Sequence, residues 1–285
     1  MALTPAQRLS ALSLSLRRRL SLLQSFLSFS RCTSSAFATS RSVGRPGVLG
    51  LCVGCLLGCS LSCSLLLPLL LGFSSRLLPL SLYLLFLSLF HALEFLTTAV
   101  YNPGVATSAS FVVDHSPAYT AALLSALLEY VLRLLLSPLL PSLRPGLGAL
   151  SLLGLLLCLG GQATRAAAMS TCGENFNHII QTGDTRQNHA LVTHGVYALL
   201  RHPSYTGWFY WSVGTQLLLG NPVNAALYAG AAWRFFGARI PYEEDTLVEL
   251  FGDEYVEYMG RSWVLIPFIG RGEKGRGGGG EKKEK

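Results

Sequence analysis

The polar segment from His189 to Tyr205 carries the groups best suited to chemistry in this chain. It reads His-Ala-Leu-Val-Thr-His-Gly-Val-Tyr-Ala-Leu-Leu-Arg-His-Pro-Ser-Tyr and lies between long leucine-rich stretches. An aromatic, apolar segment (207–236) follows it and leads into a charged patch (239–245). Such groups beside apolar segments are typical of membrane proteins in which a water-soluble ligand meets a lipidic one.

The composition indicates a polytopic membrane protein. Of the 285 residues, 51% are hydrophobic and only 13% are charged, and the mean hydropathy is +0.44. About a quarter of the residues of a soluble domain are charged. Leucine-rich stretches of roughly 18 or more residues without charge are typical of membrane spans.

These stretches predict an all-α, polytopic transmembrane helical bundle with a C-terminal helical hairpin. We expect spans at residues 48–73, 77–100, 118–140 and 147–169. The hairpin, over 205–236, is expected to be tilted or partly re-entrant, because each half of about 15 residues reaches ~23 Å against a hydrocarbon core of ~30 Å. From Arg239 onward, alternating acidic and apolar residues predict an amphipathic helix or helix pair on the membrane surface or capping the bundle.

The net charge of +7 is concentrated at the two ends of the chain. Seven arginines precede the first strong span, no acidic residue precedes Glu94, and a second basic cluster lies in the C-terminal tail. Because cytosolic segments of membrane proteins carry an excess of basic residues, both termini are expected in the cytosol. Nucleic-acid binding is not expected, because no aromatic or helical readout element accompanies the charge.

Four of the seven cysteines share one face of the first expected span, at Cys52, Cys55, Cys59 and Cys63. The odd total excludes a framework in which every cysteine forms a disulfide. One interpretation is a metal or redox site. The other, small packing residues along a membrane helix, is favoured because no histidine or carboxylate lies nearby in the sequence, and no metal site is expected.

Two carboxylates fall inside the expected spans, Glu94 and Glu129. Ionisable groups are costly in a membrane unless they are paired. Arg133 follows Glu129 by one helical turn, so we expect these two residues to form a structural pair.

The polar segment and its surroundings resemble the protein-S-isoprenylcysteine O-methyltransferase family. The resemblance rests on His189-x-Leu-Val-Thr-x-Gly-Val-Tyr197, Arg201-His-Pro-Ser-Tyr-x-Gly-Trp208 and Trp233-Arg-Phe-Phe236, followed by Arg239 and Glu243. It extends upstream through Gly173-Glu-Asn-Phe-Asn-His178 and Thr98-Ala-Val-Tyr-Asn-Pro103, and covers roughly residues 80–270. Membrane phospholipid methyltransferases and sterol reductases carry similar C-terminal elements.

The resemblance implies methyl transfer from S-adenosylmethionine to the C-terminal carboxylate of a prenylated cysteine, in CaaX-processed proteins such as small GTPases. A carboxylate with a pKa near ~3.5 is ionised at neutral pH, so it needs no general base. The reaction needs positioning and the removal of water. This agrees with a sequence that offers no catalytic triad, metal cluster or glycine-rich nucleotide-binding turn.

Carried over position by position, the resemblance implies a cytosolic cofactor pocket formed by the polar loop and the His-Pro-Ser-Tyr turn. Its members are Gln181, His189, Ala190, Leu191, Val192, Tyr197, His202, Pro203, Ser204 and Tyr205. The alternatives are interfacial aromatic anchors for the two tyrosines and a plain helix end at His202.

Arg239 is expected to be the catalytic residue that binds the substrate carboxylate, because its guanidinium fork suits that group. Glu243, one turn later, matches the cofactor-binding carboxylate of the family. The alternative is a surface salt bridge between these two residues. The segment Ile240-Pro241-Tyr242 departs from the acidic turn of the family, and the missing backbone donor of Pro241 could shift Glu243 relative to Arg239.

The prenyl chain is expected to reach the site from the membrane lipid. Its path would be bordered by Trp208, Phe209, Trp211 and the spans around Glu94 and Tyr101. The C-terminal sequence Lys282-Lys-Glu-Lys285 resembles a cytosolic dilysine retrieval signal, which implies the endoplasmic reticulum membrane.

These features divide the chain into four regions. Residues 1–46 form an arginine- and serine-rich arm or targeting segment, 47–169 the transmembrane helices, 170–269 the catalytic methyltransferase region with its hairpin, and 270–285 a disordered basic tail. Two other functions stay open: a phospholipid or small-lipid methyltransferase with the same cofactor pocket, and a non-catalytic membrane scaffold.

Overall fold

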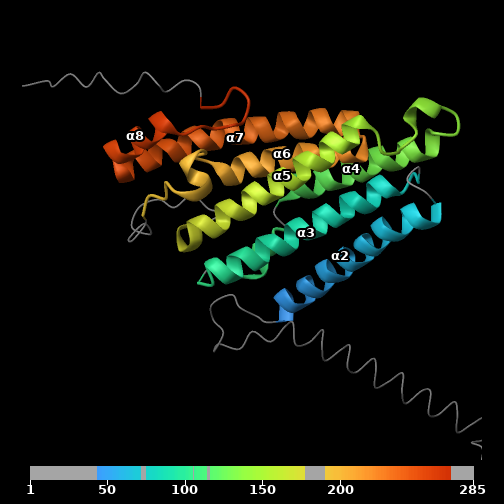
Figure 1. Cartoon of the computed structure of the whole chain (residues 1–285), viewed down its shortest axis with the longest axis horizontal. Helices are drawn as coiled ribbons and strands as arrows, with labels where there is room; N and C mark the ends of the chain where they lie inside the picture. Colours follow the sequence, from blue (N-terminus) through green and yellow to red (C-terminus); the bar gives the residue numbers. More distant parts are fainter. Residues whose placement is uncertain (1–43, 72–74, 105, 114–115, 177–189, 271–285) are drawn as a thin grey trace, which may run out of the picture.

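The computed structural model describes residues 44–71, 75–104, 106–113, 116–176 and 190–270. Helices form its regular structure (Figure 1). They are α2 (Gly44–Leu71), α3 (Leu78–Tyr101), α4 (Pro117–Leu136), α5 (Ala149–Cys172), α6 (Pro203–Leu219), α7 (Pro222–Phe251) and α8 (Asp253–Arg261), with short 3-10 turns between some of them. Almost all of the expected arm (1–46) and basic tail (270–285) lies outside the described residues.

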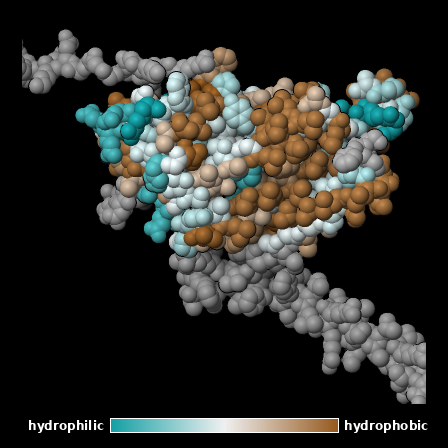
Figure 2. Space-filling view, in the orientation of Figure 1, coloured by the Kyte–Doolittle hydropathy of each residue, from teal (hydrophilic) through white to brown (hydrophobic). Residues whose placement is uncertain are grey.

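Within the described part of the chain, four helices are long and apolar enough to cross a membrane, over Cys52–Leu71, Leu78–Tyr101, Pro117–Leu136 and Ala149–Asn175. They coincide with the four expected spans. Their outward faces carry exposed leucines, such as Leu69 at 80% and Leu156 at 66%. Figure 2 shows this apolar surface across the body of the bundle, with hydrophilic residues gathered at the end where α8 lies and in a patch at the opposite end. Large exposed apolar surfaces require a non-aqueous partner, so the expected multi-pass helical membrane fold is confirmed.

The helices lie side by side in a tilted stack (Figure 1). α2 occupies one edge against α3, α5 and α6 form the middle, and α7 with α8 occupies the other edge. The core between them is apolar and aromatic, and includes the fully buried Phe90, Tyr130, Cys158 and Leu218.

α5 and α6 pack antiparallel with their backbones in direct contact. A Cβ added at Gly161 would lie 2.5 Å from the carbonyl oxygen of Gly207, and a Cβ at Gly154 would lie 2.3 Å from the nitrogen of Leu218. Any side chain at these positions is therefore excluded, and the glycines permit the close approach that small residues give membrane helices. This contact fixes the register in which the start of α6 lies beside the end of α5.

Two charged side chains of α4 hold the turn between α6 and α7. Arg133 donates from Nη1 to the carbonyl of Gly220, the left-handed C-cap of α6. Glu129 accepts from the backbone nitrogens of Val223 and Asn224 at 3.1 and 2.8 Å, at the start of α7. The expected pair between Glu129 and Arg133 is therefore wrong. Each residue satisfies an open helix end, where backbone groups lack partners within the helix.

α7 is one continuous helix that contains Pro241. The expected boundary between a membrane hairpin and a separate surface helix, near the middle of α7, is wrong. Phe236, Ile240 and Glu244 follow one another at one-turn intervals and are 2, 0 and 3% exposed. This buried face continues past Pro241, and its packing offsets the cost of a proline in a helix interior, ~3 kcal/mol.

Candidate active site

A cavity of about 480 Å³ lies between the C-terminal half of α5, the first turns of α4 and α6, and α7. Part of its wall is polar and includes Asn175 and Tyr197, and another part is aromatic and includes Trp208, Trp211 and Phe236. One cavity therefore offers hydrogen-bonding groups and an apolar surface side by side.

The cavity wall contains every expected site residue that the structure describes. These residues are Ala190, Leu191, Val192, Tyr197, His202, Pro203, Ser204, Tyr205, Arg239 and Glu243. The other two, Gln181 and His189, lie outside the described residues. The hairpin thus folds back as expected and brings its two flanking motifs to the same cavity.

The His-Pro-Ser-Tyr turn is tied to α7 by Glu244. The Arg201 Nε donates to Glu244 Oε1, and the His202 Nε2 lies 3.1 Å from the same oxygen. Burial alone would raise the pKa of Glu244, but the hydrogen bonds and charges of His202 and Arg201 outweigh it and lower the pKa from 4.5 to about 2. The carboxylate is therefore ionised at neutral pH and fixes both residues against α7.

Arg201 also ties the turn to the segment after α8. Its Nη1 donates to the carbonyl of Ser262 at 3.0 Å, and its backbone nitrogen donates to the carbonyl of Trp263 at 3.1 Å. The backbone nitrogen of Trp263 in turn donates to the carbonyl of Leu199 at 2.9 Å. The residues after α8 therefore brace the turn.

Tyr205 links the two residues of α7 that were expected to act on the reactants. Its hydroxyl donates to Glu243 Oε2 at 2.5 Å and accepts from Arg239 Nε at 2.8 Å. The guanidinium carbon of Arg239 lies 5.4 Å from the centroid of the Tyr205 ring. Pro241 does not separate Glu243 from Arg239, because both side chains bind the Tyr205 hydroxyl.

The apolar part of the wall agrees only in part with the expected prenyl path. Trp208 and Trp211 line it, as expected, and Trp211 stacks on Phe90 with ring centroids 4.3 Å apart. Phe209 is instead packed in a buried cluster with Ile266, because neighbouring helical positions point about 100° apart. From α3 the wall takes Tyr83 and Leu87 rather than Glu94 or Tyr101.

Comparisons with known proteins identify the family of this chain. A model described as the isoprenylcysteine carboxyl methyltransferase family matches residues 152–249. The Saccharomyces cerevisiae protein-S-isoprenylcysteine O-methyltransferase is 42% identical over 191 residues, which cover 66% of this chain and 80% of the yeast protein. The chain belongs to the isoprenylcysteine carboxyl methyltransferase family.

Other members of the isoprenylcysteine carboxyl methyltransferase family match in the same way. The human protein-S-isoprenylcysteine O-methyltransferase is 45% identical over 187 residues, 66% of this chain and 64% of the human protein. The chain thus spans less than two thirds of the length of that relative. A solved structure of "the eukaryotic intramembrane Ras methyltransferase" of this family matches with a TM-score of 0.71 and 36% identity, over 91% of this chain and 87% of that chain.

Two charged residues in the cavity region of this family member were not anticipated from the sequence. Arg165 lines the cavity and pairs with Glu94 inside the bundle, and Glu244 anchors the turn. A lone arginine in an apolar stretch is a signal that could have identified Arg165, because such a charge needs a partner in the membrane. For Glu244 the signal is its spacing of one helical turn after the apolar residues Phe236 and Ile240, which puts it on their face of the helix.

The cysteine row lies away from this site. Cys52, Cys55, Cys59 and Cys63 are free and exposed on α2. Among the residues that the structure describes, no three His, Cys, Asp or Glu side chains are grouped so that they could hold a metal ion.

Proposed function

We propose that this protein methylates the C-terminal carboxylate of prenylated cysteine in CaaX-processed proteins such as small GTPases, with S-adenosylmethionine as the methyl donor. The observation that carries the proposal is the single cavity shared by the His-Pro-Ser-Tyr turn and by Arg239 and Glu243, in a member of a carboxyl methyltransferase family. The solved relative is described as an intramembrane Ras methyltransferase, which supports a protein substrate that carries a lipid.

The polar part of the cavity fits S-adenosylmethionine, which supplies an electrophilic methyl group on a sulfonium when it is bound. Glu243 offers an anionic oxygen to this cation, and Tyr205 and Tyr197 offer aromatic faces worth about 1 kcal/mol each. The Tyr205 ring already lies near the cationic carbon of Arg239. The remaining cofactor-binding residues would be Gln181, His189, Ala190, Leu191, Val192, His202, Pro203 and Ser204.

Arg239 would hold the carboxylate of the prenylcysteine. Its guanidinium presents parallel N–H donors that match the two oxygens of a carboxylate. It lies on the same helix as Glu243, one turn earlier, and both line the cavity. The carboxylate and the methyl donor would thus be held by neighbouring turns of α7.

The other task of the chain is to exclude water. A C-terminal carboxylate is already ionised at neutral pH, so no side chain has to remove a proton from it. Removing water from a charged nucleophile and aligning it with the methyl group lowers the barrier. Trp208, Trp211 and Phe236 provide the apolar surface that would exclude water and receive the prenyl chain from the lipid.

The setting we propose is the endoplasmic reticulum membrane, with both termini in the cytosol. The basic residues of the N-terminal arm and C-terminal tail support this orientation through the positive-inside rule. Membership of the isoprenylcysteine carboxyl methyltransferase family is consistent with that membrane. The arm (1–46), the transmembrane helices (47–169), the catalytic region (170–269) and the basic tail (270–285) are proposed as separate regions.

The test is a methyl-transfer assay with membranes that contain the protein and labelled S-adenosylmethionine. N-acetyl-S-farnesylcysteine and phosphatidylethanolamine are offered separately as acceptors. We expect label in the farnesylcysteine ester. Transfer to the phospholipid alone would identify a lipid methyltransferase, and a lack of both transfer and cofactor binding would identify a scaffold. Either result would overturn the proposal.

A further inference from the structure

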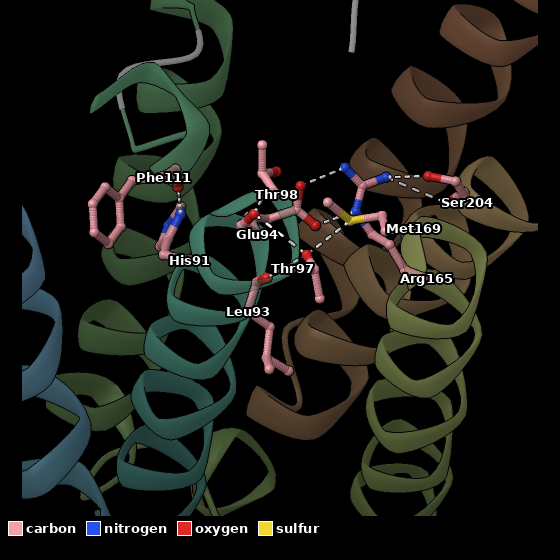
Figure 3. Close-up of polar contacts among 9 residues, drawn as sticks. All are labelled: His91, Leu93, Glu94, Thr97, Thr98, Phe111, Arg165, Met169 and Ser204. Carbon is pink, nitrogen blue, oxygen red and sulfur yellow. Dashed lines mark hydrogen bonds and ion pairs between the residues drawn. The ribbon is translucent and has the colours of Figure 1, made fainter. Parts of the chain in front are cut away.

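Glu94 of α3 and Arg165 of α5 form a buried ion pair within the bundle (Figure 3). The Arg165 Nε donates to Glu94 Oε1, and its Nη2 donates to Glu94 Oε2 at 2.8 Å. The two residues are 1 and 7% exposed. This two-point contact fixes the plane of the guanidinium as well as its position.

The third nitrogen of the same guanidinium reaches the cavity turn. The Arg165 Nη1 donates to the hydroxyl oxygen of Ser204 at 2.8 Å and to its carbonyl oxygen at 3.4 Å (Figure 3). Ser204 is 5% exposed and lines the cavity. The ion pair thus connects α3 and α5 to the first turn of α6.

The bond from Arg165 determines what the Ser204 hydroxyl can do. A serine hydroxyl has one proton to donate and two lone pairs that accept. One lone pair faces Arg165, and no described residue accepts the Ser204 proton. A cation at the hydroxyl oxygen strengthens that hydroxyl as a donor, and an anionic acceptor gains most from it.

The glycine contacts between α5 and α6 explain why these residues meet. A Cβ at Gly207 would lie 2.6 Å from the carbonyl oxygen of Gly161 and 2.9 Å from the nitrogen of Arg165. In antiparallel helices this register brings the residue one turn after Gly161 beside the residue one turn before Gly207. Those residues are Arg165 and Ser204.

We propose that Glu94 and Arg165 are positioning residues, and that through them Ser204 donates a hydrogen bond to a carboxylate of a bound reactant. The inference rests on the proposed function, which supplies two such carboxylates. One is at the amino-acid end of S-adenosylmethionine and the other is at the C-terminus of the prenylcysteine. Glu94 does not touch either reactant. Its role is to hold the Arg165 guanidinium in the one orientation that also reaches Ser204.

The test compares the binding of each reactant that carries a carboxylate (an acid) with the binding of a counterpart molecule that lacks the carboxylate. Dissociation constants are measured by calorimetry on the purified full-length protein. The ligands are S-adenosylmethionine, its decarboxylated form, N-acetyl-S-farnesylcysteine and the carboxamide of the latter. In Ser204→Ala, one acid should bind about tenfold more weakly, and its counterpart should change by less than about twofold. The acid that is affected identifies the source of the carboxylate.

Two further variants test the role of the ion pair. Arg165→Lys keeps the charge opposite Glu94 but loses the fork that reaches Ser204, so it should fold and reproduce the loss seen in Ser204→Ala. The double variant Glu94→Leu with Arg165→Met leaves no unpaired charge behind and should weaken the same acid. Adding Ser204→Ala to Arg165→Lys should raise the dissociation constant of the affected acid by less than about another twofold, because both changes remove the same hydrogen bond.

Ser88→Ala serves as the matched control. Ser88 is a buried serine of α3 whose hydroxyl donates to the carbonyl of Leu84. It should leave all four constants unchanged. The proposal is overturned if Ser204→Ala changes neither acid, if it weakens an acid and its counterpart equally, or if Arg165→Lys binds both acids as the wild type does. Failure of the proposed function is distinct, because the wild-type protein would then not methylate N-acetyl-S-farnesylcysteine.

Discussion

The hydroxyl of Tyr205 donates a hydrogen bond to the carboxylate of Glu243 at 2.5 Å. The bond joins the first turn of α6 to the second half of α7 and closes the hairpin at the cavity. The same hydroxyl accepts from Arg239. One phenol thus sets the distance between the two side chains that we expect to hold the carboxylate and the cofactor.

Tyr205→Phe should weaken S-adenosylmethionine binding by roughly tenfold. The change leaves the ring in place but removes the donor that holds the Glu243 carboxylate, and a hydrogen bond to a charged group contributes ~1.5–3 kcal/mol. Calorimetric titration measures the effect. Tyr210→Phe is the control, because the Tyr210 hydroxyl donates to the carbonyl of Leu265 at the protein surface. Equal affinities in the two variants would contradict a role for the Tyr205 hydroxyl.

Gly207→Ala should lower the thermal unfolding midpoint and weaken ligand binding. The added methyl group would lie 2.6 Å from the carbonyl oxygen of Gly161, so α5 and α6 must separate, and overpacking of this kind costs ~1–3 kcal/mol. Gly160→Ala is the control, because a Cβ at Gly160 meets nothing within 4 Å. A midpoint in Gly207→Ala equal to that of Gly160→Ala would show that the helices are not in backbone contact.

Glu244→Gln should destabilise the protein by ~3–5 kcal/mol, because it leaves the buried Arg201 without its charge partner. His202 loses the same acceptor, so cofactor binding should weaken as well. Unfolding midpoints and cofactor titration check both effects. Glu249→Gln, at an exposed position of the same helix, should match the wild type. A stable Glu244→Gln variant would contradict the anchoring role of this carboxylate.

The wild-type protein should become less stable as the pH falls, because Glu244 stabilises the fold only while its carboxylate is ionised. The folded-state pKa is about 2, below the ordinary 4.5, so the carboxylate stabilises the fold fully above pH 4.5 and loses that effect as the pH falls toward 2. The unfolding midpoint is measured for wild type and Glu244→Gln between pH ~6 and ~3. The gap between them should narrow only below pH ~4.5. A difference in unfolding midpoint that stays constant over this pH range would show that protonation of Glu244 does not control stability.

The spans could be predicted from the sequence because each depends on local pattern. Leucine-rich stretches indicate membrane helices wherever they occur. A turn rich in hydrogen-bonding groups between such stretches indicates a site at their end. The site residues were implied by the family resemblance, and those at Tyr197, Ser204 and Arg239 line one cavity.

The polar partnerships inside the bundle could not be predicted because they depend on packing. Glu129 has Arg133 one turn away on its own helix, yet each residue binds the α6–α7 turn. Arg165 pairs with Glu94, a residue 71 positions earlier, because glycine contacts set the register of α5. Pro241 was expected to disturb the local geometry, but the buried face of α7 continues past it.

The most direct test of the central claim is the value of kcat/KM for N-acetyl-S-farnesylcysteine in Arg239→Ala. The assay uses purified protein, saturating S-adenosylmethionine and the wild type alongside. Arg234→Ala, an exposed arginine on the same helix, is the control. We predict transfer by the wild type and Arg234→Ala, and a fall of roughly a hundredfold in Arg239→Ala, because a carboxylate without its guanidinium loses ~2–4 kcal/mol. Wild-type activity in Arg239→Ala, or a wild type that does not methylate this acceptor, would contradict the account.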